Sequence, residues 1–87
     1  MSGYPYALEK ALSVPHLSRI DRRVLSTLAA FAHGPGPEWS VSIPQTDLLL
    51  LTDLHPQELE LGLRHLAADQ LLQVRQSGEH LNCRIRL

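Results

Sequence analysis

The leucines between Pro44 and Gln70 fall in two consecutive blocks, and each block predicts a helix. In the second block the apolar residues lie four and three positions apart, on one side of a helix: Leu59, Leu63 and Leu66. This spacing predicts a helix over residues 56–69. The first block is an unbroken run of leucines, and it predicts a shorter helix over residues 45–52.

The residues from Thr52 to His55 separate the two blocks and carry the signals of a helix end and a helix start. Pro56 fits the first turn of a helix, where its missing N–H costs nothing. Asp53 tolerates the left-handed backbone that a tight turn needs. Two helices joined by so short a connection predict a helix-turn-helix, a unit that can present its second helix to a groove.

Two further helices are expected before this unit. Residues 6–12 predict a short helix, which would not be stable alone in water and must dock on the domain or on a second copy. Ser18 predicts the start of a longer helix, because its hydroxyl suits the N-cap and Asp21 suits the positive helix end. His33 and Gly34 are expected to close that helix. Its buried face is expected to consist of Val24, Leu25, Leu28, Phe31 and Ala32.

Toward its end the chain changes to a period of two. Residues 72–76 and 81–87 alternate apolar and polar positions, and the turn residues between them predict a β-hairpin. Residues 39–43 alternate in the same way after a predicted loop at 35–37, and they predict a third strand beside the hairpin. The inward side chains are expected to be Trp39, Val41, Ile43, Leu81, Cys83, Ile85 and Leu87. The outer face is expected to be basic and to consist of Arg75, His80, Asn82, Arg84 and Arg86.

Composition excludes several classes of protein. With 87 residues the chain is expected to form one small domain, too small for a deep catalytic cleft between domains. It has no apolar run near the roughly 18 residues of a membrane span, so we expect no membrane association. The N-terminus lacks a secretory signal, which predicts a cytoplasmic location. The single Cys83 is expected to be a small buried apolar residue.

Residues with catalytic or metal-binding chemistry are not grouped along the sequence. The five histidines lack the paired spacing of a metal site, and the chain has neither a phosphate-binding glycine loop nor a nucleophile motif. We therefore expect the protein not to be an enzyme, with no cofactor, no metal site and no small-molecule substrate.

Charge is distributed unevenly although the net charge is only −1. Residues 44–70 contain one arginine and five acidic residues, a net charge of −4, whereas residues 71–87 have a net charge of +2. DNA binding draws much of its affinity from cations that neutralise phosphates. Any cationic surface must therefore lie outside the predicted helical pair.

The order of these elements and the residues within them resemble the winged helix-turn-helix superfamily over residues 17–87. The residues that carry the resemblance are Arg23, Val24, Leu25, Leu28, Ala29, Phe31 and Ala32, followed by Asp47, Leu48, Thr52, Asp53, Leu54, Leu59, Leu63, Leu66, Leu71 and Leu72. This pattern is similar to that of small prokaryotic regulators and of plasmid or phage replication-initiator modules. The resemblance implies a mainly α fold with a small β-sheet: a three-helix core, a C-terminal β-hairpin wing, and a short N-terminal helix in an extension over residues 1–16.

The resemblance also implies binding of double-stranded DNA in transcription regulation or replication initiation. The residues expected to read base edges from the second helix are Gln57, Glu58, Glu60, Arg64 and His65. The residues expected to hold phosphates are Arg22, Arg23, Arg75, Arg84 and Arg86. The chain departs from the family's pattern at Asp53, where glycine is usual, and at His55, where serine or threonine is usual.

A second hypothesis is that the same fold recruits a protein partner or forms a homodimer, because such domains also serve as interaction modules. Leu50 and Leu51 occupy positions that are usually charged in the family, and Leu61 lies on the helix face that would enter a major groove. These leucines would form an exposed partner interface rimmed by Glu58 and Glu60. Alternatively, the N-terminal helix or a second subunit covers them.

Overall fold

The computed structural model describes residues 6–34 and 38–87, and within them it contains four helices and a three-stranded antiparallel sheet. In chain order the elements are α1 (Tyr6–Ser13), α2 (Arg19–Ala30), β1 (Glu38–Pro44), α3 (Gln45–Thr52), α4 (Pro56–Ala68), β2 (Leu72–Ser77) and β3 (His80–Arg86). The expected combination of helices with a small antiparallel sheet is confirmed. The predicted loop at 35–37 and the first five residues of the predicted N-terminal extension lie outside the described residues.

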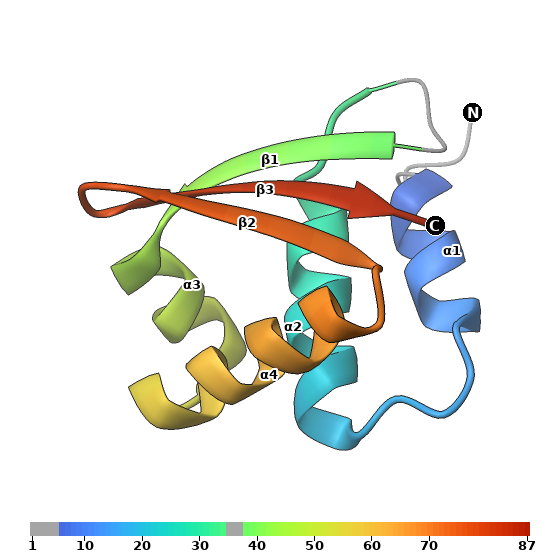
Figure 1. Cartoon of the computed structure of the whole chain (residues 1–87), viewed down its shortest axis with the longest axis horizontal. Coiled ribbons are helices and arrows are strands. Elements are labelled where there is room, and N and C mark those ends of the chain that lie inside the picture. The colour runs from blue at the N-terminus through green and yellow to red at the C-terminus, as the bar shows by residue number, and fades with distance from the viewer. Residues whose placement is uncertain (1–5, 35–37) are drawn as a thin grey trace.

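The sheet has the strand order β1-β3-β2 and covers one side of the helices, so the molecule has two layers (Figure 1). Val41 lies opposite Cys83, which in turn lies opposite Val74. Because side chains alternate along a strand, this register turns one set toward the helices. The buried residues of the sheet are Trp39, Val41, Ile43, Leu72, Leu81, Cys83 and Ile85. The predicted inward set is thus confirmed, apart from Leu87, which follows β3 and is only partly buried.

A two-residue turn joins β2 to β3, as the turn residues predict. Ser77 pairs with His80, and Gly78 between them has a φ of +62°. The tight hairpin turns need a positive φ at the first central position, which glycine adopts without steric cost. The N–H of Gln45 donates to the Glu79 carbonyl oxygen at 2.8 Å, so the end of the hairpin is tied to the start of α3.

α2 is the central helix of the helical layer, and α1, α3 and α4 all contact it. Its fully buried residues are Val24, Leu25, Leu28 and Ala29. α4 approaches α2 through Gly62, where an added Cβ atom would lie 3.1 Å from Val24 Cγ2 and 3.3 Å from Ile20 Cγ2. A large side chain at position 62 would therefore force the two helices apart.

The connection between α3 and α4 has the backbone that the sequence predicts. Asp53 adopts the left-handed conformation, with φ 56° and ψ 37°, and its N–H donates to the Leu49 carbonyl oxygen at 2.9 Å. At the start of α4, the Glu58 carboxylate accepts a hydrogen bond from the His55 N–H at 3.0 Å. These bonds satisfy backbone groups that helix ends leave without intrahelical partners, and they hold the turn in one conformation.

The end of α2 differs from the prediction, because the helix ends at Ala30 rather than at His33 and Gly34. His33 instead pairs with Ser40 of β1: its N–H donates at 2.8 Å, and its carbonyl oxygen accepts at 2.7 Å. A residue whose backbone pairs with a strand cannot also continue a helix. Phe31 therefore lies beyond the last helical residue and is 48% exposed, so the prediction that it is buried was wrong.

α1 packs on α2, so the short helix docks on its own domain. Ala11 is buried in the common core, and the Arg22 guanidinium donates to the carbonyl oxygens of Leu12 and Val14 at 3.2 and 3.0 Å. The alternative in which α1 covers the leucines of the helical pair is wrong. The side chains that it leaves uncovered are Leu50, Leu51 and Leu61, with exposed fractions of 81%, 52% and 46%.

Candidate functional site

The outward surface of α4 carries three of the five residues expected to read bases. Gln57, Glu60 and Arg64 are exposed there, together with Leu61. Arg64 Nη2 donates to Glu60 Oε1 at 2.8 Å, which makes an ion pair between residues four apart on one helix. Both side chains are largely exposed, so water and salt weaken the pair, and it can open when a ligand approaches.

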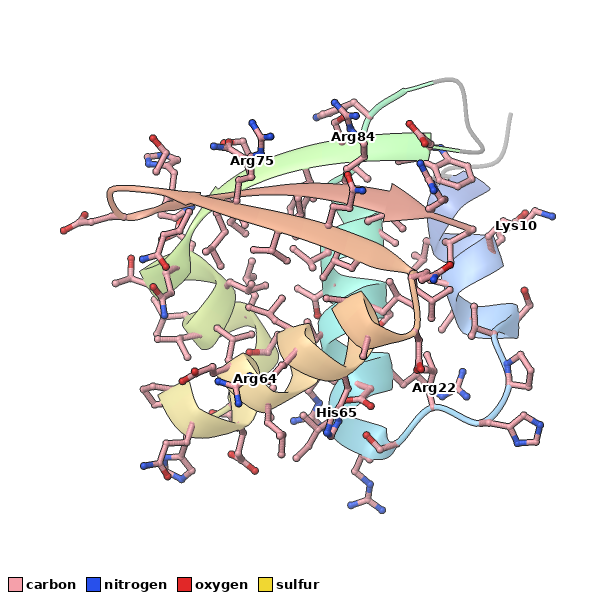
Figure 2. The ribbon with its side chains drawn as sticks, in the orientation of Figure 1. Lys10, Arg22, Arg64, His65, Arg75 and Arg84 are labelled. Carbon is pink, nitrogen blue, oxygen red and sulfur yellow. The ribbon has the colours of Figure 1, made fainter. Side chains whose placement is uncertain are left out.

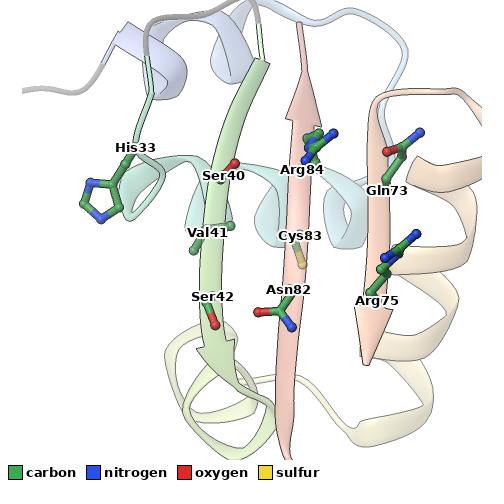
Figure 3. A pocket seen from close by; sticks show the side chains of 9 residues that line it. All are labelled: His33, Ser40, Val41, Ser42, Gln73, Arg75, Asn82, Cys83 and Arg84. Carbon is green, nitrogen blue, oxygen red and sulfur yellow. The ribbon is translucent and has the colours of Figure 1, made fainter. Parts of the chain in front are cut away.

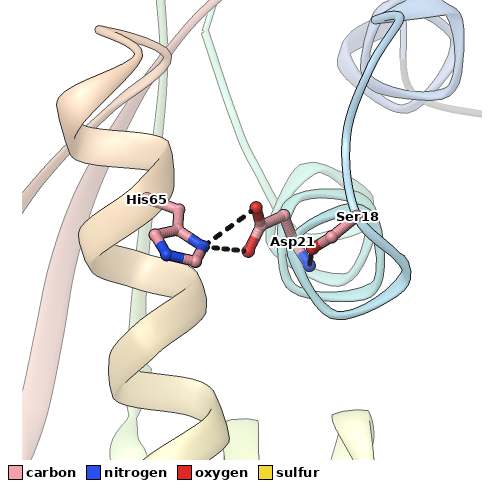
Figure 4. Close-up of polar contacts among 3 residues, drawn as sticks. All are labelled: Ser18, Asp21 and His65. Atoms are coloured by element: carbon pink, nitrogen blue, oxygen red, sulfur yellow. Dashed lines mark hydrogen bonds and ion pairs between the residues drawn. The ribbon is translucent and has the colours of Figure 1, made fainter.

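The other two expected base readers, Glu58 and His65, are held by contacts within the domain. Glu58 accepts the hydrogen bond at the start of α4. His65 faces α2, and its Nδ1 lies 3.2 Å from each carboxylate oxygen of Asp21 (Figure 4). Asp21 is only 6% exposed, and its N–H donates to Ser18 Oγ at 3.1 Å. The contact between Asp21 and His65 thus ties α4 to the first turn of α2, while half of the His65 side chain stays exposed.

The two arginines on α2 that were expected to hold phosphates contact the ends of other helices. Arg22 donates to the carbonyl oxygens at the end of α1, as described above. Arg23 Nη1 donates to the Thr52 carbonyl oxygen at the end of α3, at 3.2 Å. Cationic side chains suit helix C-termini, because they satisfy free carbonyl groups and oppose the negative end of the helix dipole. Both guanidinium groups therefore fasten neighbouring helices to α2.

The other three expected phosphate contacts, Arg75, Arg84 and Arg86, lie on the strands β2 and β3. Arg86 is paired with Glu38 of β1, because its Nε and Nη2 donate to Glu38 Oε1 at 3.0 and 2.8 Å. Arg75 and Arg84 project from the sheet on the side away from the helices (Figure 2). Neither forms a hydrogen bond or an ion pair with any residue in the ranges 6–34 and 38–87.

A shallow hollow of about 480 Å³ lies over this outer side of the sheet (Figure 3). Its lining residues come from all three strands and from the bridge before β1: His33, Ser40, Val41, Ser42, Gln73, Arg75, Asn82, Cys83 and Arg84. The exposed side chains among them carry guanidinium, amide, hydroxyl and imidazole groups, which can donate hydrogen bonds. Among the described residues, none that lines this hollow carries a carboxylate. We call the exposed set of Ser40, Ser42, Gln73, Arg75, Asn82 and Arg84 the outer sheet face.

An apolar groove of about 500 Å³ lies at another place, between the end of α2, β1 and α3. Phe31 and Leu51 both line it, and Leu50 is exposed on the same helix as Leu51. Sequence reasoning missed Phe31 because the apolar spacing of α2 continues to it. Gly34, which was expected to close the helix, lies four positions beyond the observed end at Ala30, so it did not signal that end.

Within residues 6–34 and 38–87, no group of three or more histidine, cysteine and acidic residues could hold a metal ion. Burial raises the pKa of the Cys83 thiol to about 11, so at neutral pH it stays protonated and unreactive. Across the same residues, every helix is too short or too polar to cross a membrane.

Comparison of the chain with protein-family models, with curated proteins and with solved structures gave no match.

Proposed function

We propose that the chain is a winged helix-turn-helix domain that binds double-stranded DNA. The order of the elements supports the proposal, because α2, β1, α3 and α4 are followed by a hairpin. The left-handed turn at Asp53 and the pairing of β1 with β3 support it further. In this interpretation α4 enters the major groove and the β2–β3 hairpin, tied to the start of α3, is the wing.

The open outward surface of α4 is the observation that carries the proposal. Gln57 and Arg64 are exposed on it, and such side chains pair with adenine and guanine edges, while Glu60 can accept from cytosine. Because the helical pair is acidic, the affinity must come from arginines on other elements. The domain would act in transcription regulation or replication initiation.

A fluorescence anisotropy titration with a random-sequence duplex tests the proposal. We expect binding at low salt that weakens steeply as the salt concentration rises, because bound arginines release counterions from the DNA. A salt-independent response, or no binding at low salt, would reject DNA binding.

Replacement of Arg64 tests the role of α4 in reading sequence. With a duplex selected from a random library, Arg64→Ala should reduce the preference for the selected site by about 1 to 3 kcal/mol and relax it at one base pair. Arg19→Ala is the matched control, because it removes the same charge from an exposed position at the start of α2. If both variants weaken selected and random duplexes equally, α4 does not read bases.

A second candidate function, association with a protein partner or a second copy, is favoured by the exposed apolar side chains of α3. Leu50 is 81% and Leu51 52% exposed, and exposed apolar patches mark interaction sites. In sedimentation velocity, Leu50→Glu should abolish any dimer of the wild-type protein. Leu12→Glu on α1 is the control, since Leu12 is also a largely exposed leucine. A wild-type protein that stays monomeric at all concentrations would exclude the homodimer.

A further inference from the structure

We propose that the outer sheet face binds the phosphate groups of a nucleic-acid backbone, and that Arg75 and Arg84 together form the centre of this site. The inference rests on the proposed function and deepens it, because it selects which of the expected arginines hold phosphates. It also places a backbone contact on the side of the sheet that faces away from the helices, in addition to the contact that α4 would make (Figure 2).

The strand register sets the spacing of the two arginines. Arg75 lies opposite Asn82, and Arg84 lies two residues farther along β3, opposite Gln73. Such diagonal neighbours on adjacent strands are about 7 to 8 Å apart, within reach of long side chains. The two guanidinium groups can therefore contact one phosphate or two consecutive phosphates.

The surroundings of the two arginines favour an anion. On its other side Arg84 lies opposite Ser40, so the cross-strand neighbours of both arginines are neutral hydrogen-bonding residues. The two like charges repel each other, and the described part of the chain places no carboxylate in the hollow to compensate them. A bound phosphate would remove that repulsion and accept hydrogen bonds from guanidinium, amide and hydroxyl groups at once.

A second hollow adjoins the first, and together they suit an extended ligand better than a single ion. It measures about 380 Å³, shares Gln73 and Arg84 with the first hollow, and is also lined by Arg86 and by Ala67 of α4. Hydrogen-bond donors thus continue from the middle of the sheet, across β2, to the end of α4. Neither hollow is lined by a described phenylalanine, tyrosine or tryptophan, the residues on which unpaired bases stack. The backbone of a duplex fits this surface better than splayed bases do.

Glu38 competes with a bound phosphate for Arg86. Its carboxylate holds Arg86, which lines the second hollow, so Arg86 is partly neutralised in the free protein. Removing the carboxylate would release a third arginine to the same surface. The site therefore predicts one substitution that strengthens binding as well as two that weaken it.

The test measures duplex binding by anisotropy over a series of salt concentrations. Arg75→Ala and Arg84→Ala should each weaken binding roughly tenfold at low salt. Each should also reduce the slope of log K against log salt by about 0.9, the value for one lost phosphate contact. Arg84→Lys should keep most of the slope, because it retains the charge. Glu38→Gln should increase the affinity, and Arg19→Ala should match the wild type in affinity. Thermal unfolding checks that the variants are folded.

The outcomes separate this inference from the proposed function. If the wild-type protein binds duplex and Arg75→Ala and Arg84→Ala behave like Arg19→Ala, the phosphate site is wrong while DNA binding stands. If the wild-type protein does not bind duplex, DNA binding is wrong, and titration with tripolyphosphate followed by NMR decides what the face binds. Shifts confined to the outer sheet face would then keep the phosphate site but overturn the nucleic-acid backbone as its ligand. The absence of such shifts would overturn the site itself.

Discussion

The outward surface of α4 and the outer sheet face both carry charged side chains, but only the sheet leaves its arginines without partners. On α4, Arg64 pairs with Glu60. On the sheet, Arg75 and Arg84 contact none of the groups in the described ranges that could neutralise them. The domain therefore offers cationic surface on its sheet, although the helix-turn-helix is the unit expected to face DNA.

The difference follows from the geometry of the two elements. On a helix, side chains four residues apart lie side by side, so a segment rich in both charges neutralises itself. On a strand, neighbours on the same face come from adjacent strands, and their identity depends on the register. The register of this sheet places Ser40 and Gln73 beside Arg84, whereas only Arg86 meets a carboxylate across the strands.

The largest expected effect is a loss of stability at high pH, and it distinguishes the buried side of β3 from its outer side. Burial raises the Cys83 pKa from 9.0 to about 11, so the folded state disfavours the thiolate and its stability is complete only below pH 9. The free energy of unfolding should fall by about 2 kcal/mol as the pH rises from 9 to 11. Urea denaturation at several pH values measures this. In Cys83→Val the free energy of unfolding should fall by about 2 kcal/mol less over the same pH range. An unchanged decrease would contradict the role given to the Cys83 thiol. Arg84→Ala, on the outer side of the same strand, should retain the full decrease.

The next effect concerns the contact between α2 and α4. Asp21→Ala leaves His65 without its partner and removes an acidic group from the first turn of α2. We expect a loss of about 1 to 2 kcal/mol in the free energy of unfolding. Chemical denaturation gives the stability, and anisotropy gives the affinity for duplex. At a temperature where the variant is folded, its affinity for duplex should stay within about twofold of the wild-type value. A large loss of affinity with unchanged stability would instead indicate that His65 contacts the DNA.

The smallest expected effect comes from freeing the arginine of α4, which would make the outward surface of α4 more like the outer sheet face. Glu60→Gln frees Arg64 and makes the surface of α4 less acidic. Duplex affinity at low salt should rise about two- to fivefold, while stability falls by only about 0.3 to 0.5 kcal/mol. Asp69→Asn is a control, because it removes one negative charge at the exposed end of α4. Equal gains in both variants would show that net charge, rather than release of Arg64, determines the affinity.

Much of the local structure could be predicted because it depends on neighbours in sequence. Ser18 caps α2 through the N–H of Asp21, three residues away, and Asp53 takes the left-handed turn where glycine is usual. The alternation around Cys83 gives its burial directly. The site could be predicted only as a set of exposed positions. Which arginines fasten helices, as Arg22 and Arg23 do, depends on carbonyl groups that are distant in the sequence.

The sequence by itself determined the helices, the strands, the tight turn and the side of each strand that is buried, because hydrophobic period and capping act over a few residues. Only the tertiary structure decided where α2 ends, because the pairing of His33 with Ser40 competes with the helix for the same backbone groups. It also decided that Gly62 is the contact of α4 with α2 and that Asp21 meets His65. Finally, it decided which arginines stay unpaired, because a charge is neutralised by what folding brings near it and not by what precedes it in the chain.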